Sequence, residues 1–173
     1  MKVLVICPWA FNPGEMWPTL RSLKAEGVHF EVASTKSIIE EERARTETPR
    51  KFRVKTLDEV DANEFDGLIV IGGHRIPREK LYYDTTVRAI VEAFERQNKP
   101  IAAICAAVPV IRYILKGRRC TVFPYSKCIV MLQREGAIIE DASIVEDGNV
   151  ITAQSESCIE AMIERFVRKL RGR

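Results

Sequence analysis

The chain has 173 residues, 46% of them hydrophobic, and its 27 basic and 24 acidic residues give a formal net charge of +3. This length suits about one domain, and the near-balanced charge excludes the strong positive field that gathers nucleic acids. The N-terminal apolar run is too short for a signal peptide, and no run approaches the roughly 18 residues of a membrane helix. We therefore expect one cytoplasmic domain over residues 1–173, with neither a nucleic acid nor a membrane as partner.

The cysteines and histidines limit the metal chemistry. The five cysteines are odd in number, widely spaced and without a C-x-x-C pair. This pattern argues against a disulfide framework and against structural zinc. His29 and His74 are the only histidines, so imidazole ligands for a metal are scarce. We expect no metal site and no cofactor.

The first part of the chain alternates strand and helix patterns. The valine-rich residues 2–7 predict a strand buried on both faces, and residues 15–26 have the 3.6-residue spacing of a helix that stops at Gly27. Residues 28–34 alternate as a second strand. The charge-dense residues 37–47 predict a solvated excursion from the fold, and the "FRVKT" stretch after them predicts a short strand.

The same alternation continues to the C-terminus. Residues 65–73 are a wholly apolar strand that ends in two glycines, which indicates a turn at the carboxyl end of that strand. The remaining expected elements are a helix over 85–97, a strand over 99–105, a helix over 106–115, a strand over 120–124, a helix over 127–135, a hairpin over 137–153 and a helix over 159–170.

Strands that alternate with helices and are buried on both faces predict an α/β fold. We expect a doubly wound, mostly parallel sheet with helices on both faces and a small β-hairpin near the C-terminus. In such sheets ligands bind beyond the carboxyl ends of the strands, near the point where the strand order reverses. The chemistry is therefore expected just after Cys7, Ile71 and Ile104.

Cys105 lies at one of these strand ends with small residues on both sides. A nucleophile elbow needs small side chains two positions before and after the nucleophile, because larger ones collide with the neighbouring strand and helix. Ala103 and Ala107 occupy those positions. The N-terminus of the following helix would favour a thiolate. The pattern alone is equally compatible with an ordinary buried cysteine.

Other strand ends supply possible partners for this thiol. Gly72 and Gly73 follow a buried strand, and their N–H groups, with that of Ala106, could form an oxyanion hole. Glu15 follows the first strand, where it could serve as a general acid or base for the thiol. A glutamate in a first helical turn is more often a simple match to the helix dipole.

Taken together, these stretches resemble the ThiJ/PfpI superfamily. The matching segments are "MKVLVI" with Glu15 after it, "DGLIVIGG" followed by "RIPREKL", "KPIAAICAA", and "DGNVITA" before the last helix. They cover nearly the whole chain in the family's order. The resemblance implies the flavodoxin-like fold of the class I glutamine amidotransferases and a homodimer or a higher homo-oligomer.

The resemblance also implies roles for the residues at the strand ends. Cys105 would be the nucleophile, Glu15 its carboxyl partner, and Gly73 and Ala106 the oxyanion donors. The family includes PfpI-type intracellular proteases, deglycases and glyoxalases that act on dicarbonyls, and oxidation sensors or chaperones.

The chain departs from the family pattern at its histidines. PfpI-type proteases have histidine directly after the cysteine, where this chain has Ala106. The Parkinsonism-associated deglycase branch has a later histidine, where this chain has Phe123. His74 is the only histidine expected near the crevice, and we treat it as a third catalytic candidate. Gly72 and Phe123 are candidates for substrate binding.

These observations predict a cysteine-dependent enzyme that acts on a small carbonyl, acyl or amide substrate. One alternative is a PfpI-like intracellular cysteine peptidase, which would take a peptide as substrate. The other is a non-catalytic redox sensor or stress-response chaperone that uses an oxidisable Cys105.

Overall fold

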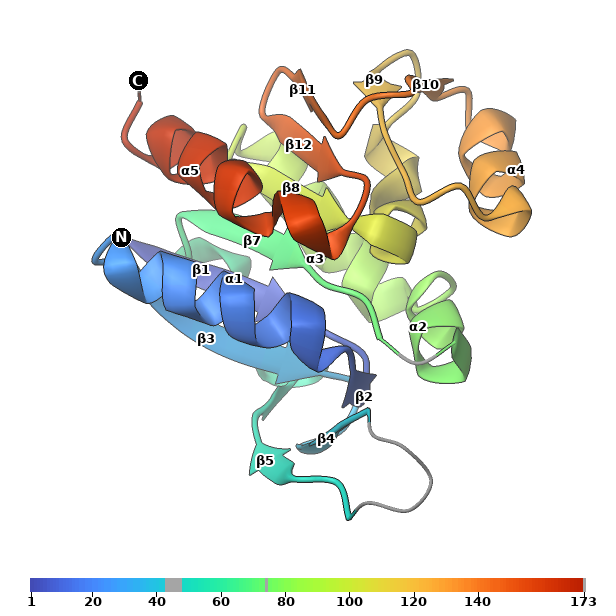
Figure 1. Ribbon diagram of the computed structural model, residues 1–173. Coiled ribbons are helices and arrows are strands. Elements are labelled where there is room, and N and C mark those ends of the chain that lie inside the picture. Colours follow the sequence, from blue (N-terminus) through green and yellow to red (C-terminus); the bar gives the residue numbers. More distant parts are fainter. Residues whose placement is uncertain (43–47, 74, 173) are drawn as a thin grey trace.

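The computed structural model describes residues 1–42, 48–73 and 75–172. Its centre is a seven-stranded sheet in the order β11-β12-β8-β7-β1-β3-β6, in which only the β11–β12 pair is antiparallel (Figure 1). This confirms the predicted α/β, doubly wound sheet with a C-terminal hairpin. The strands are β1 (Lys2–Ile6), β3 (His29–Ser34), β6 (Lys55–Thr56), β7 (Gly67–Val70), β8 (Ile101–Ile104), β11 (Ile144–Asp147) and β12 (Val150–Ala153).

Helices cover both faces of this sheet. Helices α1 and α5 lie side by side on one face, while α3 and a 3-10 helix over Cys105–Ile114 pack together on the other (Figure 1). None of the helices in the described ranges is long and apolar enough to span a membrane. The α-helices are α1 (Pro13–Ala25), α2 (Arg75–Leu81), α3 (Thr85–Arg96), α4 (Ser126–Arg134) and α5 (Ile159–Leu170).

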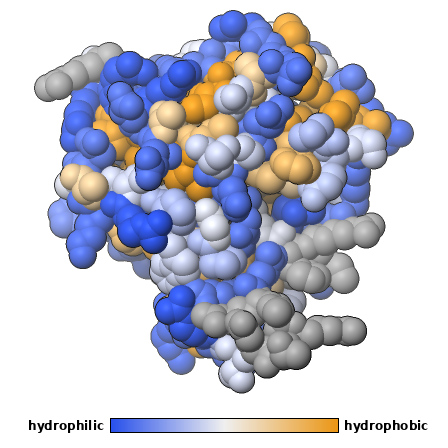
Figure 2. All heavy atoms as spheres, viewed as in Figure 1, coloured by the Kyte–Doolittle hydropathy of each residue, from blue (hydrophilic) through white to orange (hydrophobic). Residues whose placement is uncertain are grey.

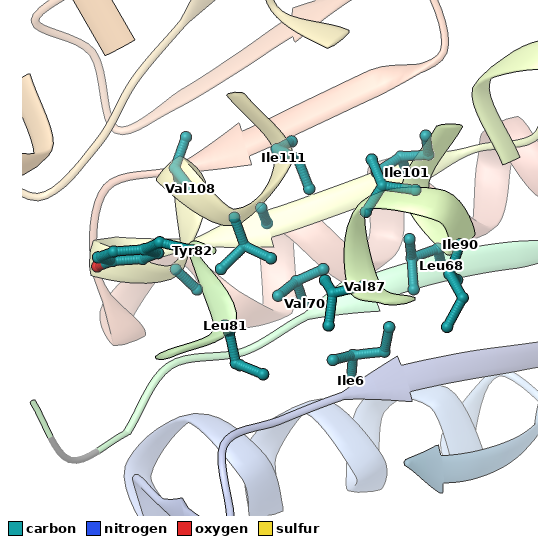
Figure 3. Close-up of a cluster of buried hydrophobic side chains, with 14 of the residues drawn as sticks. Ile6, Leu68, Val70, Leu81, Tyr82, Val87, Ile90, Ile101, Val108 and Ile111 are labelled. Atoms are coloured by element: carbon teal, nitrogen blue, oxygen red, sulfur yellow. The ribbon is translucent and has the colours of Figure 1, made fainter. Parts of the chain in front are cut away.

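The strands divide the core into two layers, because successive side chains of a strand point to opposite faces. In β1, Leu4 and Ile6 belong to the cluster beneath α3, whereas Val3 and Val5 belong to the cluster beneath α1 and α5. Figure 3 shows the first cluster, with Ile6 near side chains from the neighbouring strand and from α3. Cys105 packs against both clusters, so it lies at the edge where the two layers meet.

Two small sheets lie outside the main one. The strands β2 (Ala10–Phe11), β4 (Ile38–Glu41) and β5 (Lys51–Arg53) form the first, which projects below the main sheet in Figure 1. The prediction that residues 37–47 form a solvated segment is therefore wrong for residues 38–41. Ile39 and Glu41 are buried there, because the strand pairs on both sides. Residues 43–47 lie outside the described residues.

Several predicted elements differ in type or extent. The helix expected over 106–115 is a 3-10 helix that starts at Cys105 itself. The strand expected over 120–124 is reduced to β9 (Arg119–Cys120), which pairs with β10 (Ile138–Ile139). Helix α2 was not predicted. The last helix agrees at both ends with the expected 159–170.

The surface is mostly hydrophilic in the view of Figure 2, with hydrophobic groups gathered in its upper half. Tyr125, Val130 and Ile138 are among the exposed large hydrophobic residues, and they belong to the part of the chain around α4 and β10.

Candidate active site

Cys105 has an unusual backbone conformation at the end of β8. Its φ is +56°, in the left-handed region that non-glycine residues rarely occupy. Such a conformation costs about 1–2 kcal/mol and persists only where the surroundings hold it. Ala103 and Ala107, two positions away on either side, are fully buried. The small neighbours and the sharp turn are those of an elbow, and they leave the Cys105 side chain half-buried at the sheet edge.

Glu15 lies in the first turn of α1 and is only 3% exposed. Its Oε2 accepts a hydrogen bond from the Gly72 N–H at 2.6 Å, and its Oε1 accepts one from Asn12 Nδ2 at 3.3 Å. Burial raises the pKa of this carboxyl to about 7, although both hydrogen bonds oppose the shift. Glu15 can therefore accept or release a proton near neutrality.

Glu156 is a second carboxylate close to Glu15 that the sequence analysis did not identify. The Nδ2 of Asn12 lies 3.3 Å from Glu156 Oε2 as well as from Glu15. The negative charge of Glu156 contributes to the raised pKa of Glu15. Glu156 lies 141 positions after Glu15 in the numbering, and no local pattern links the two.

Burial, with a smaller contribution from the nearby Glu15 carboxylate, raises the pKa of the Cys105 thiol to about 12. The Ala106 N–H, which is hydrogen-bonded to the sulfur, and the Arg78 cation act in the opposite direction. The helix N-terminus thus favours the thiolate, as expected, but it is not the largest influence on the pKa of Cys105. Desolvation and the neighbouring carboxylate outweigh the helix N–H groups, and the resting group is a thiol.

The Gly72–Gly73 turn lies at the same edge of the sheet as Cys105, because β7 and β8 are parallel neighbours whose carboxyl ends meet there. The turn is bonded to the first crossover, since Asn12 N–H donates to the Gly72 carbonyl at 3.3 Å. Gly73 bridges Phe11, and a Cβ at Gly73 would lie 2.7 Å from Phe11 Cα. The site residues follow the ends of β1, β7 and β8, and the strand order reverses between β1 and β7.

Two other candidates are not brought to the thiol by any described contact. His74 lies outside the described residues. Phe123 is half-buried in the loop before α4, and its ring packs against that of Tyr125 with centroids 4.6 Å apart. Its role in substrate binding stays a prediction.

Arg78 of α2 is the cation that the sequence analysis did not assign to the site. Its Nη1 donates to the Gly73 carbonyl at 3.0 Å. Its positive charge lowers the pKa of both Glu15 and Cys105. Arg78 also lines a cavity of about 550 Å³, together with Tyr82, Tyr125 and Cys128. The sequence analysis did not find this contact, because α2 is too short for its helical pattern to be recognised. Arg78 is also one of several charged residues in this part of the chain.

The described residues contain no cluster of three or more histidine, cysteine, aspartate or glutamate side chains that could hold a metal ion. The groups that the described residues supply at the site are a thiol, a carboxyl group that titrates near neutrality, a guanidinium and backbone N–H groups.

An α/β sheet with a cysteine elbow and an adjacent buried glutamate defines a class of flavodoxin-like proteins. The chain belongs to the DJ-1/PfpI family, whose model matches residues 1–169. It is 31% identical over 176 residues to a deglycase of Thermococcus kodakarensis, covering 99% of this chain and 100% of the relative. It is 32% identical over 156 residues to an uncharacterised protein of Methanocaldococcus jannaschii, covering 88% of this chain and 74% of the relative.

The solved structures support the same fold. The crystal structure of a ThiJ/PfpI domain protein from Brachyspira murdochii superposes with a TM-score of 0.86 at 21% sequence identity, covering 99% of this chain and 97% of that one. The resemblance inferred from the sequence motifs is therefore confirmed, and relatives with enzyme names point to enzymatic activity.

Proposed function

We propose that the protein is a cysteine-dependent enzyme whose Cys105 adds to the carbonyl carbon of a small reactive carbonyl compound, as in glyoxalase or deglycase chemistry. The observation that carries this proposal is the pairing of a left-handed elbow thiol with a buried carboxyl group whose pKa is raised to about 7. The deglycase name of a relative that aligns over 99% of this chain supports it.

The resting thiol needs a base before it can attack. In the fraction of molecules in which Glu15 is ionised, its carboxylate takes the proton of Cys105 while the sulfur forms a bond to the carbonyl carbon. The π electron pair of the C=O bond moves to oxygen. The N–H groups of Gly73 and Ala106 stabilise this oxyanion, and Glu15 then returns the proton to it. The product of this step is a hemithioacetal, and Glu15 is again a carboxylate.

A 2-oxoaldehyde allows the reaction to continue without an external oxidant. Glu15 removes the C–H proton of the hemithioacetal carbon and returns it to the neighbouring carbonyl carbon. The hydroxyl proton of the first carbon passes to the neighbouring carbonyl oxygen, so the neighbouring carbon becomes an alcohol. The first carbon is oxidised to a thioester while the second is reduced, so the electrons balance within the substrate. Water then hydrolyses the thioester, which releases a 2-hydroxy acid and restores the thiol.

The two alternatives receive less support from the site. A peptidase must activate its thiol against an unreactive amide and protonate a leaving amine, and Ala106 occupies the position of the PfpI-type histidine. A redox sensor needs a thiolate that peroxide oxidises readily, whereas burial raises the pKa of Cys105 to about 12.

The test is turnover of methylglyoxal by the wild-type protein, by Cys105→Ser and by Glu15→Gln. We expect lactate from the wild-type protein and a loss of at least about 100-fold in kcat for either variant, the usual scale for an essential nucleophile or general base. Cys158→Ser is the control, because Cys158 is also a free, half-buried cysteine.

Turnover that survives in Cys105→Ser would reject the proposed role of the thiol. Absence of turnover in the wild-type protein, with rapid peroxide oxidation of Cys105, would favour the sensor. Cleavage of a peptide substrate in place of methylglyoxal would favour the peptidase.

A further inference from the structure

We propose that helix α2 and the residue after it form a clamp in which Arg78 and Tyr82 are positioning residues for the oxyanion hole. The inference rests on the proposed function, because it assigns a structural cause to the placement of the two N–H donors. From the sequence, their position after the glycine turn is compatible with a pocket rim, a dimer contact or plain surface packing, and it assigns neither residue a role in placing the donors.

The clamp has one contact to each donor residue. Arg78 Nη1 donates to the carbonyl of Gly73 at 3.0 Å, and the Tyr82 hydroxyl donates to the carbonyl of Ala106 at 2.5 Å. Residues four positions apart lie on the same face of a helical turn, and Tyr82 continues the last turn of α2 through its N–H, which donates to the Glu79 carbonyl at 3.2 Å. One face of one element therefore reaches both donor residues.

The clamp contacts add to the placement of the donors, because both donors lie beyond the strands of the main sheet. Ladder hydrogen bonds hold β7 to β8 through the register pair of Val70 and Ala103. Gly73 and Ala106 each come three residues after that pair, where the described strands have ended. Oxyanion stabilisation depends on donors that are already placed about 3 Å from the developing charge. Side-chain hydrogen bonds to both donor residues add to that placement.

The Tyr82 end of the clamp is itself held in place. Tyr82 is 1% exposed, and Figure 3 shows its hydroxyl oxygen at the outer edge of the apolar cluster. Its carbonyl accepts hydrogen bonds from Arg112 Nη1 at 2.5 Å and from the Tyr113 hydroxyl at 3.1 Å. Arg112 is buried and belongs to the same 3-10 helix that begins at Cys105. The tyrosine is therefore bonded to both ends of the segment that carries the nucleophile.

The two clamp residues differ in their effect on the ionisation of Glu15 and Cys105. The Arg78 guanidinium lowers the pKa of Cys105 and of Glu15, so its removal alters both position and ionisation. The Tyr82 hydroxyl is not among the main causes of either shift. Tyr82→Phe is therefore the variant that tests positioning alone.

The experiment compares Tyr82→Phe with Tyr83→Phe, a matched control that removes the hydroxyl of a neighbouring tyrosine that is 64% exposed. We expect Tyr82→Phe to lower kcat for methylglyoxal by about 10-fold or more with little change in KM, the pattern for loss of an interaction made in the transition state. Alkylation of Cys105 by iodoacetamide forms no oxyanion, so its rate should be unchanged in both variants.

The arginine end is tested with Arg78→Met and Arg78→Lys. We expect Arg78→Met to lower kcat and to slow alkylation at a given pH, and Arg78→Lys to recover part of both, because lysine keeps a hydrogen-bond donor group and the positive charge. Arg96→Met, which removes an exposed arginine of α3, is the control.

Amide hydrogen exchange separates a failure of the clamp from a failure of the proposed function. The clamp predicts faster exchange at Ala106 and Ala107 in Tyr82→Phe and at Gly73 in Arg78→Met, even if the wild-type protein has no turnover. Unchanged exchange at these amides would overturn the clamp. Equal losses of kcat and of alkylation rate in Tyr82→Phe would also overturn it, because they would indicate displacement of the thiol itself.

Discussion

Glu15 is a carboxyl group in a place from which water is largely excluded. Its pKa is raised from 4.5 to about 7, chiefly because burial disfavours the charged form. In the pH range between these values the folded protein keeps a proton that the unfolded chain releases. By linkage, the resulting contribution to the free energy of unfolding is complete below the unfolded pKa and is lost as the pH rises towards the folded one.

This linkage predicts the effect of Glu15→Gln on stability. Relative to the wild-type protein, the variant should gain roughly 3 kcal/mol in the free energy of unfolding between about pH 4 and pH 8, since one pKa unit corresponds to about 1.4 kcal/mol. Urea unfolding of both proteins at the two pH values measures the difference. Glu160→Gln, which alters an exposed carboxyl group in the first turn of α5, is the control. A difference independent of pH would contradict the burial argument.

The backbone of Cys105 supplies a second prediction at the residue scale. Its φ of +56° disfavours every side chain that has a Cβ, whereas glycine adopts this region at little cost. We therefore expect Cys105→Gly to be more stable than Cys105→Ala by about 1 kcal/mol, despite the greater flexibility of glycine in the unfolded chain. Thermal unfolding of the two inactive variants measures this. Greater stability of the alanine variant would show that the turn is not strained.

At the scale of elements, the approach of the β7 turn to β2 depends on Gly73. A Cβ there would lie 2.7 Å from Phe11 Cα, and backbone atoms cannot move aside as a side chain can. We expect Gly73→Ala to lower the free energy of unfolding by about 1–3 kcal/mol, as overpacking does, and to lower kcat because it moves an oxyanion donor.

Gly67→Ala provides the comparison for this prediction. A Cβ at Gly67, at the start of β7, would meet the end of the Phe166 side chain at 2.7 Å, far along the strand from the thiol. Both variants should lose stability, but only Gly73→Ala should lose turnover at a temperature at which both remain folded. Equal turnover would show that the Gly73 turn does not position the site.

At the scale of the whole molecule, Asn149 joins the C-terminal hairpin to the rest of the sheet. Its side chain donates to the Glu95 carboxylate and to the Lys99 carbonyl, each at 3.0 Å, and accepts from Arg118 Nη1 at 3.0 Å. Its carbonyl accepts from the Ile101 N–H at the start of β8. One side chain thus connects α3, the loop after it and the approach to β9.

Loss of this side chain should destabilise the whole fold. We expect Asn149→Ala to lower the free energy of unfolding by about 1–3 kcal/mol, because it removes the three hydrogen bonds that this side chain makes with half-buried groups. Gln133→Ala, at an exposed position of α4, is the control, and urea unfolding is the measurement. A cost no larger than that of the control would show that the network adds nothing to stability.

Much of this fold was predictable because buried strands and helices have recognisable patterns of apolar residues in the sequence. Strand β1 and helix α5 have continuous apolar and 3.6-residue patterns, and both were predicted close to their observed bounds. Strand β4 was missed because its carboxylates resemble a solvated segment, and only its neighbours show why Glu41 is buried. Trp17 Nε1 and Arg50 both donate to that carboxylate.

The sequence by itself determined the family, the order of the elements and the small residues that a turn at Cys105 requires. These properties are local, since they depend on periodicity and on steric room within a few residues. Only the tertiary structure decided that Cys105 rests as a thiol, that Glu15 titrates near neutrality and that α2 reaches both sides of the crevice. Those properties depend on desolvation and on contacts such as that of Glu15 with Gly72, 57 residues apart, which no local pattern encodes.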